Sequence, residues 1–375
     1  MGLEFLDGNQ AVVRAAERAK CNFFAGYPIT PSSSILDGML EMLWRTGGIG
    51  LQAEDEIASI GLCLGSAMAG SKVLTATSGP GLSLYSESIG LAIIGETPLV
   101  IVIVQRQGPA TGAATKGAEG DILFARWGTS GGMPVIVLSP ASVAETYDLT
   151  YRAFNLTERF RVPVLVMSNK EIGLTRETVD LDAIELPPLV ERRRPDGKAP
   201  TFPYAFHSPE EVPPMVDLAC GGHMLRYTTS THDKAGFLVI NPAVIQEMID
   251  HYVAKVETAT DEIAFVKEDR QDGAETLVIS YGIVSRSVKA AVRQARAAGA
   301  KVSSLVLQTL YPVPRRAIEK ALRNVRKVVV PEMNMGQYVQ EIERLTRQSV
   351  PVVRINKMDT TLLSVDQILE QGGLL

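Results

Sequence analysis

The sequence of 375 residues is poor in cysteine and histidine, the side chains that most often bind metal ions. Its three cysteines, Cys21, Cys63 and Cys220, are isolated, and no Cys-x-x-Cys pair is present. An iron–sulfur cluster normally needs four thiolates, so we do not expect this chain to hold one alone. The four histidines show no metal-ligand spacing either. We therefore expect no metal site here, and any redox centre should lie on another polypeptide.

Long hydrophobic runs and a strong charge bias are also missing. The most apolar stretch, residues 97–104, is too short to span a bilayer. The amino-terminal residues lack the basic and apolar pattern of a secretory signal. With 42 acidic and 37 basic residues the formal net charge is −5, which argues against non-specific nucleic-acid binding and against a basic membrane patch. We expect a cytoplasmic protein that binds neither membranes nor nucleic acid.

Apolar runs that alternate with helical patterns predict an α/β fold. In residues 1–180 the strands are expected at 21–25, 72–77, 99–104, 135–138 and 162–167, and the main helices at 11–19, 32–43 and 57–69. Continuous runs of Val, Ile and Leu separated by helices are typical of a parallel sheet covered on both faces. Residues 273–375 repeat the alternation on a smaller scale, with strands expected at 276–281, 301–307, 327–330 and 352–355. The sequence therefore predicts two doubly wound, mostly parallel sheets.

Prolines interrupt the chain between these two units. Residues 181–272 are expected to form an extended connector that wraps rather than packs, with one helix at 242–269. A structureless loop of that length is improbable inside one domain, so we interpret it as a crossing between domains. The predicted divisions are residues 1–180, 181–272 and 273–375.

The loop from Gly26 to Pro31 directly follows a predicted strand, which is where open α/β sheets place ligands. Pro28 and Pro31 stiffen its backbone, and Thr30 offers a hydroxyl group. Such a loop suits the recognition of a small oxygen-rich substrate. An ordinary turn that caps a helix is the alternative interpretation.

A second candidate is Glu56, which follows two other acids and opens an apolar, glycine-rich helix. Acids at the start of a helix usually interact favourably with its dipole, and this is the simpler interpretation. A carboxyl group in apolar surroundings can also act as a general acid or base near neutral pH.

The third candidate is the segment Thr77–Gly81, which follows another predicted strand. Its glycines allow a ligand to approach the backbone closely, and the next helix offers free N–H groups. Its spacing matches neither a dinucleotide fingerprint nor a Walker loop, so a plain tight turn is the alternative.

Together these segments resemble a known architecture. Glu56, then Ala69-Gly70, a strand and Ser78-Gly79-Pro80-Gly81 resemble the pyrimidine-binding domain of thiamine-diphosphate enzymes. The loop 27–31 is similar to that of 2-oxoacid:ferredoxin oxidoreductases, and residues 105–112 and 115–121 look like the α subunit of the 2-oxoglutarate members. Residues 273–375 resemble the transketolase C-terminal domain, so the resemblance covers nearly the whole chain.

The resemblance implies roles for individual residues. Glu56 matches the family glutamate that hydrogen-bonds the aminopyrimidine ring of thiamine diphosphate and activates the cofactor. Thr30 and Arg106 match positions that hold the carboxylate and carbonyl of the 2-oxoacid, for which a guanidinium group is well suited. Lys116 is the candidate for the second carboxylate of 2-oxoglutarate. The further cofactor-binding candidates are Tyr27, Pro28, Ile29, Ser78 and Gly79.

The family's diphosphate motif, which begins Gly-Asp-Gly, is missing from this sequence. The resemblance therefore implies a β subunit that carries the diphosphate, Mg²⁺ and an iron–sulfur cluster, combined with this chain in a heterotetramer. Coenzyme A would be the co-substrate, ferredoxin or flavodoxin the electron acceptor, and a separate γ subunit is also possible. The carboxyl-terminal unit, which contains the segments 280–282 and 331–334, is expected to serve dimer and subunit contacts.

Two other functions compete with CoA-dependent oxidation of 2-oxoglutarate. The substrate could be pyruvate or a branched-chain 2-oxoacid, although an apolar substrate tail would leave the charge of Lys116 unpaired. The chain could also be a non-catalytic assembly module that kept the fold, which the joint presence of Glu56, Thr30 and Arg106 argues against.

Overall fold

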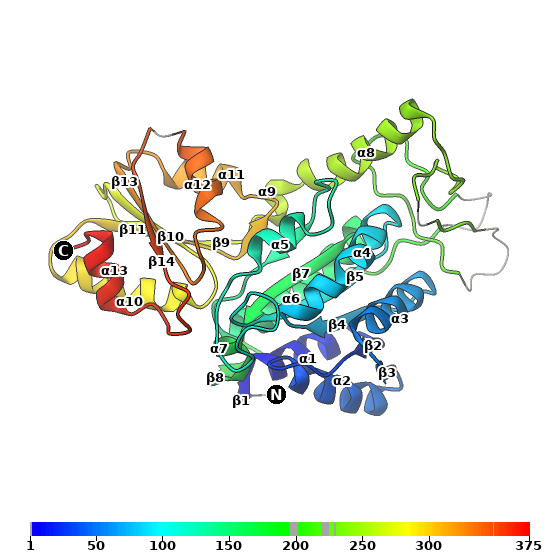
Figure 1. Ribbon diagram of the computed structural model, residues 1–375, viewed down its shortest axis with the longest axis horizontal. Helices are drawn as coiled ribbons and strands as arrows, with labels where there is room; N and C mark the ends of the chain where they lie inside the picture. Colours follow the sequence, from blue (N-terminus) through cyan, green and yellow to red (C-terminus); the bar gives the residue numbers. More distant parts are fainter. Residues whose placement is uncertain (1, 196–201, 219–224, 229, 348) are drawn as a thin grey trace.

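The computed structural model contains two large sheets, which lie side by side along the longest axis of the molecule, and a small two-stranded one (Figure 1). It describes residues 2–195, 202–218, 225–228, 230–347 and 349–375. In this part of the chain no helix is long and apolar enough to cross a membrane.

The larger sheet has seven strands in the order β12-β6-β7-β5-β4-β2-β3. Its strands are β2 (Phe23–Gly26), β3 (Ile49–Gln52), β4 (Val73–Thr77), β5 (Leu99–Gln105), β6 (Ile136–Leu138), β7 (Pro163–Asn169) and β12 (Thr309–Tyr311). All neighbours are parallel except β12, which pairs antiparallel with β6 and comes from the carboxyl-terminal part of the chain.

Helices cover both faces of this sheet. One face packs against α1 (Gly8–Arg18), α2 (Ser33–Thr46) and α6 (Val143–Phe160). The other face packs against α3 (Glu56–Met68), α4 (Gly79–Ile94) and α5 (Ile122–Trp127). Polar caps fix where several of these helices begin, and in α1 the Asp7 side chain accepts from the Gln10 N–H while Gln10 reaches back to the Asp7 N–H.

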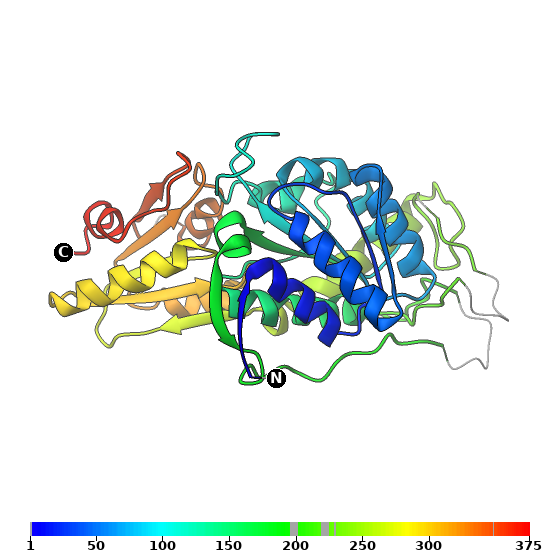
Figure 2. The ribbon, with the colours of Figure 1, turned by 90° about the horizontal axis from the view of Figure 1, so that it is seen from below.

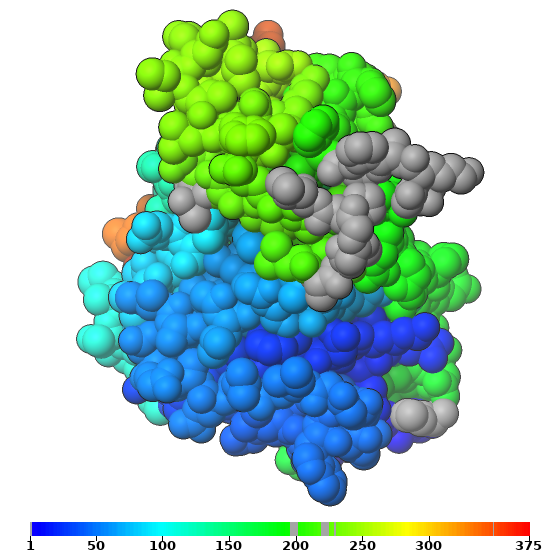
Figure 3. Space-filling model, turned by 90° about the vertical axis from the view of Figure 1, so that its right-hand side faces the viewer, coloured from blue at the N-terminus to red at the C-terminus, as the bar shows by residue number. Residues whose placement is uncertain are grey.

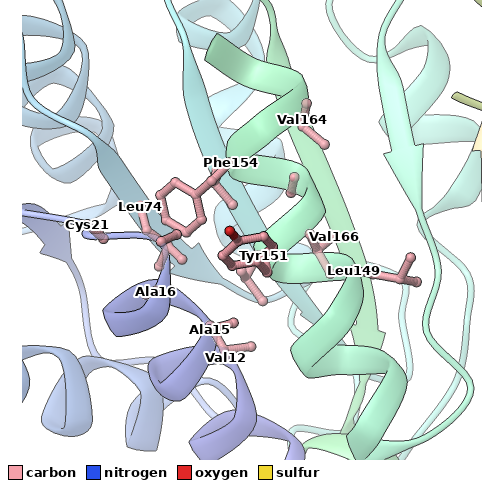
Figure 4. Packing of buried hydrophobic residues seen from close by; sticks show 14 of the residues in the cluster. Val12, Ala15, Ala16, Cys21, Leu74, Leu149, Tyr151, Phe154, Val164 and Val166 are labelled. Atoms are coloured by element: carbon pink, nitrogen blue, oxygen red, sulfur yellow. The ribbon is translucent and has the colours of Figure 1, made fainter. Parts of the chain in front are cut away.

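The core between α1 and α6 illustrates how the first face is packed (Figure 4). Small residues of α1, Ala15 and Ala16, let the larger Tyr151 and Phe154 of α6 approach closely. The strand side chains beneath alternate between the two faces of the sheet, so Val164 and Val166 point here while Leu165 belongs to the opposite core.

The smaller sheet has five strands in the order β14-β13-β10-β11-β9. They are β9 (Val266–Asp269), β10 (Thr276–Ser280), β11 (Val302–Leu307), β13 (Lys327–Glu332) and β14 (Val352–Asn356). The helices α10 (Val284–Ala297) and α13 (Val365–Gly372) cover one face, seen in yellow and red in Figure 2, and α11 (Arg315–Ala321) and α12 (Val339–Thr346) cover the other. Apart from the antiparallel edge strand β9 the pairing is parallel, so the predicted α/β class with two doubly wound, mostly parallel sheets is confirmed.

The remaining elements lie at the edges of the two sheets. The strands β1 (Leu3–Asp7) and β8 (Arg176–Asp180) form an antiparallel pair beside α7 (Lys170–Leu174). The helix predicted at 242–269 is wrong beyond residue 257, because α8 (Pro242–Glu257) is followed by α9 (Thr260–Ile263) and then by β9. Pairing with β11 overrides the helical composition of residues 266–269.

The expectation that the connector wraps without packing is also wrong for its described residues. Figure 3 shows the yellow-green connector resting on the blue and cyan surface of the larger unit. The guanidinium of Arg192 is buried, where it forms ion pairs with Glu158 at 2.9 Å and with Asp217 at 3.2 Å. The connector therefore belongs to the packed structure, and the division into residues 1–180, 181–272 and 273–375 stays a prediction.

Candidate functional site

The predicted segments meet at the carboxyl-terminal edge of the seven-stranded sheet. The loop 26–31 follows β2, and Ser78 follows β4, the neighbouring strand. The chain runs outward from β2 to β3 and then returns past β2 to β4, so the strand order reverses between β2 and β4. Such a reversal is where open α/β sheets bind ligands.

Glu56 is the first residue of α3 and is 6% exposed. Its neighbour Asp55 caps the helix by accepting a hydrogen bond from the N–H of Ala58 at 2.7 Å. The favourable interaction with the helix start is thus provided by Asp55. The Glu56 carboxylate forms neither a hydrogen bond nor an ion pair with any residue that the structure describes, so it is available to a ligand.

Gly81 lets the first turn of α4 approach Glu56. A Cβ atom at this position would lie 1.9 Å from the Oγ1 atom of Thr77 and 2.8 Å from the Cγ atom of Glu56. Within the described chain, the buried hydroxyl groups of Thr77 and Ser78 have no hydrogen-bond partner. Buried polar groups are normally paired with protein, water or ligand atoms, so these hydroxyls are available to hydrogen-bond a ligand bound here.

Arg106 joins two loops beside this group. It is 8% exposed, and it donates hydrogen bonds to the carbonyl oxygen of Thr30 at 2.7 Å and to that of Thr111 at 2.8 Å. Its Nε atom has no partner among the described residues. Burial lowers the pKa of Arg106, and the negative charges of Asp121 and Glu56 oppose that shift. The structure therefore brings together Glu56, Thr30 and Arg106, which the sequence predicted as one site.

Asp121 is a member of the site to which the sequence reasoning gave no role. Its N–H donates to the Oε1 atom of Gln105 at 3.1 Å, and its Oδ2 atom would lie 3.1 Å from a Cβ atom at Gly79. Oδ2 has no hydrogen-bond partner in the described part of the chain. Burial raises the pKa of Asp121 to about 6, although the positive charge of Arg106 lowers it. In the sequence, Asp121 is marked only as an acidic residue at the end of the segment 115–121, directly before α5.

The other predicted residues form the rim of the site. Tyr27, Pro28 and Thr30 are exposed and Ile29 is half-buried. Lys116 is exposed as well, and its ammonium group forms no ion pair with any described residue, while its carbonyl oxygen accepts from the N–H of Gln107, the residue after Arg106, at 2.9 Å.

Asn9 is a second residue that the sequence reasoning missed. Its amide group is buried and donates to the carbonyl oxygen of Pro31 and to the hydroxyl of Ser34, both at 2.8 Å. These two bonds fix the end of the loop 26–31 against α1 and α2. No local pattern marks this asparagine, because both of its partners lie more than twenty residues away.

Comparison with known families explains this arrangement. Residues 14–251 match the family described as pyruvate flavodoxin/ferredoxin oxidoreductase, thiamine diphosphate-binding. Residues 274–368 match the family described as pyruvate:ferredoxin oxidoreductase core domain II. The chain belongs to the 2-oxoacid:ferredoxin oxidoreductases.

Individual relatives indicate which type of 2-oxoacid:ferredoxin oxidoreductase subunit this chain resembles. The 2-oxoglutarate synthase subunit KorA of Methanocaldococcus jannaschii is 41% identical over 359 residues, which cover 96% of each chain. The subunit of the same name from Archaeoglobus fulgidus is 39% identical over 92% of each chain. The ketoisovalerate oxidoreductase subunit VorB of Methanothermobacter thermautotrophicus is 32% identical, with 99% of this chain and 97% of VorB covered. The predicted resemblance to α subunits of the 2-oxoglutarate type is confirmed.

Solved structures agree with this assignment. The 2-oxoglutarate:ferredoxin oxidoreductase from Magnetococcus marinus, solved with 2-oxoglutarate, coenzyme A and succinyl-CoA bound, superposes with a TM-score of 0.93 at 30% identity. The match covers 99% of this chain and 65% of the Magnetococcus chain. A split-gene transketolase superposes with a TM-score of 0.54 at 14% identity, which shows a shared fold.

Proposed function

We propose that this chain is the α subunit of a 2-oxoglutarate:ferredoxin oxidoreductase and that it provides the half of the active site that holds the aminopyrimidine ring of thiamine diphosphate. The observation that carries the proposal is the buried, unpaired carboxylate of Glu56 beside Gly81. The complete enzyme would convert 2-oxoglutarate, coenzyme A and two oxidised ferredoxins into succinyl-CoA, CO₂, one proton and two reduced ferredoxins. The same residues would serve the reverse reaction.

The residues at the site fit this cofactor. A buried carboxyl group without a partner can hydrogen-bond a ring nitrogen, and the unpaired hydroxyls of Thr77 and Ser78 can satisfy further polar atoms. When bound, thiamine diphosphate supplies the stabilisation of negative charge on carbon that decarboxylation requires. Glu56 would hold and release a proton at the ring nitrogen. Ser78 and Gly79 would border the ring, and Tyr27, Pro28 and Ile29 would form the outer wall.

Arg106 and Thr30 are proposed to hold the 2-oxo and 1-carboxylate oxygens of the substrate. The two main-chain bonds of Arg106 orient its guanidinium group before substrate arrives, which reduces the entropy lost on binding. We assign the distal carboxylate of 2-oxoglutarate to Lys116. Its side chain is exposed on the loop after Arg106, and the hydrogen bond from the N–H of Gln107 to its carbonyl oxygen at 2.9 Å supports a place beside the substrate group.

The outer surface of α3 and α4 is proposed as the docking face for the β subunit. Ile57, Leu62 and Leu84 are exposed on this surface, and Gly61 and Gly65 leave its middle flat. Apolar exposure of this kind marks interaction sites. A partner docked here would cover Glu56 from the side that the chain leaves open. The β subunit would carry the diphosphate, Mg²⁺ and iron–sulfur cluster, and ferredoxin or flavodoxin and a possible γ subunit would bind the assembled complex.

The test is turnover of the complex formed with its β partner, measured as CoA-dependent reduction of methyl viologen. We expect 2-oxoglutarate to be preferred over pyruvate and 2-oxoisovalerate. Glu56→Gln should lower kcat by about 100-fold or more, in the range that proton transfer by a positioned side chain contributes, while the complex still assembles.

Glu54→Gln is the matched control, because Glu54 is exposed two residues away, and it should retain full turnover. Wild-type turnover by the Glu56→Gln complex would favour a non-catalytic module. Turnover by this chain alone would refute the idea that it provides half of a site.

A further inference from the structure

Two segments of the carboxyl-terminal unit, residues 280–282 and 331–334, lie in the part of the chain that is expected to serve subunit contacts. The side chains of Tyr281, Glu332 and Asn334 in these segments are buried within the chain itself, and the expectation that the carboxyl-terminal unit contacts other subunits stays a prediction. The hydroxyl of Tyr281 donates to the Oε1 atom of Glu332 at 2.7 Å, and the amide of Asn334 contacts the Tyr281 hydroxyl at 2.7 Å. Their function must therefore be sought inside this chain.

This cluster and the residues after it bind the main chain on both sides of Asp121. The amide of Asn334 donates to the carbonyl oxygen of Glu119 at 2.8 Å, and the N–H of Glu119 donates to the carbonyl of Met333 at 2.9 Å. The side chain of Gln337 donates to the carbonyl of Gly120 at 2.6 Å and accepts from the N–H of Leu123 at 3.0 Å. Four hydrogen bonds thus fix a short stretch of the larger unit to one loop of the smaller one.

The side chain of Glu119 is held by residues outside the loop 331–337. Its Oε1 atom accepts from the N–H of Ile283 at 2.9 Å and from the amide of Asn169 at 2.8 Å. Gly282 has a φ of +56°, and a Cβ atom there would lie 2.0 Å from the same oxygen. Only glycine fits this position, because it adopts a positive φ without strain and has no Cβ atom to clash with the Glu119 carboxyl group.

From these contacts we infer that Asn334 and Gln337 are positioning residues of the active site. By fixing residues 119–123 they hold the carboxylate of Asp121 against Gly79 and beside Arg106. Charges interact strongly where water is excluded, so a small displacement of Asp121 changes the environment of Arg106 and of any anion bound there. The expected effect on catalysis rests on the proposed function. The expected effect on the position of residues 119–123 rests on the hydrogen bonds alone.

The catalytic test compares Gln337→Ala with Gln340→Ala in the assembled complex. Gln337 is half-buried, so its truncation should not prevent folding, and Gln340 is an exposed neighbour whose side chain, among the described residues, bonds only to the carbonyl of Gly336. We expect Gln337→Ala to lower kcat/KM for 2-oxoglutarate by about 10-fold, a modest misplacement effect, and Gln340→Ala to change it by less than about 2-fold.

A double-mutant cycle separates positioning from a general structural effect. Once Asp121→Asn has removed the carboxylate, Gln337→Ala should cost less than about 2-fold further, because the group that it positions is gone. Independent, multiplicative losses in the two variants would overturn the inference.

Hydrogen–deuterium exchange on the full chain tests the same inference without turnover. Gln337→Ala should accelerate exchange of the amides in residues 117–123 by about 10-fold relative to Gln340→Ala, because local opening becomes easier. Unchanged exchange would overturn the inference while leaving the proposed function intact. Accelerated exchange together with an inactive wild-type complex would support the inferred contacts and reject the proposed function.

Discussion

Gly81 shows how one missing side chain shapes the site. Gly81→Ala should destabilise the isolated chain by about 1–3 kcal/mol, the usual range for overpacking, because the new methyl group overlaps Thr77 and meets Glu56. Turnover of the complex should fall as well, since Glu56 is displaced. Urea unfolding of the isolated chain measures the first effect.

Gly65→Ala provides the opposite control within the same pair of helices. Gly65 lies on the exposed side of α3, and no atom of the described residues comes within 4 Å of its Cβ position, so alanine should stabilise the chain by about 0.5–1 kcal/mol. Equal effects at the two positions would contradict the close contact at Gly81.

Glu119 makes stability depend on pH. Burial raises the pKa of its carboxyl group to about 7, well above the ordinary value for a glutamate. The folded chain therefore keeps a proton that the unfolded chain loses, and this contribution is complete below pH 4.5 and is lost as the pH rises to 7. In the Glu119→Gln variant the side-chain amide cannot ionise, and its Oε1 atom still accepts the hydrogen bonds from Ile283 and Asn169.

The Glu119→Gln variant should be more stable than the wild type at pH 8 by about 3 kcal/mol, the energy equivalent of this pKa shift, and equally stable at pH 4. Thermal or urea unfolding at the two pH values measures the difference, with Glu54→Gln as a control that changes neither. A variant that is less stable at pH 8 would show that the carboxylate form is the one the fold prefers.

The residues of the site differ in how visible they were in the sequence. Glu56 and the loop 26–31 could be predicted because each follows a strand and carries its chemistry in neighbouring residues. Asp121 and Asn9 could not, because their significance comes from contacts with Gly79 and Pro31 that only the folded chain creates.

At the scale of elements, α8 is anchored to the larger unit by a buried charge network. Lys255 of α8 donates to the Oε2 atom of Glu96 at 2.8 Å, and the Nε2 atom of His251 lies 3.1 Å from the same oxygen. Burial alone would raise the pKa of Glu96, but the charges of Lys255 and Arg161 and the bond from His251 hold it well below its usual range. The network adds to the apolar packing of this helix, in which Met248 and Tyr252 contact Tyr204 and Phe206.

Lys255→Met should therefore destabilise the chain by about 3–5 kcal/mol, since one partner of a buried pair would be removed. Lys267→Met is the matched control, because the pair of Lys267 with Glu145 is exposed on the lysine side, and it should cost less than about 1 kcal/mol. Urea unfolding of both variants gives the comparison. Similar small losses would mean that the buried network contributes no net stability.

The same region shows where element prediction fails. The long apolar strands and amphipathic helices were predictable from periodicity, because their pattern is local. Residues 266–269, Val-Lys-Glu-Asp, carry no strand pattern, and they become β9 because the edge of β11 offers them hydrogen bonds. The three-residue strand β12 could not be predicted from the sequence either, because its partner β6 lies far away in the chain.

At the scale of the whole molecule, the two sheets are not independent. β12 completes the edge of the larger sheet, and one apolar core continues from α3 and α4 to α11 and α12. A fragment of residues 1–272 would leave β6 as an open edge and half of this core exposed.

We expect this fragment to aggregate or to lack fixed tertiary packing, and the full chain to unfold in a single transition. Size-exclusion chromatography and near-ultraviolet circular dichroism measure both properties. A monomeric fragment with a native near-ultraviolet spectrum would show that the larger sheet is stable without β12.

The origin of β12 also matters while the protein is being made. A ribosome releases the chain from its amino terminus, so Glu56 and its loops emerge long before the last edge of their own sheet. The edge of the larger sheet at β6 cannot be completed until Tyr311 has left the exit tunnel, by which point most of residues 273–375 has been translated. In a chain that stops before Tyr311, β6 therefore stays unpaired at the edge of the sheet that carries Glu56.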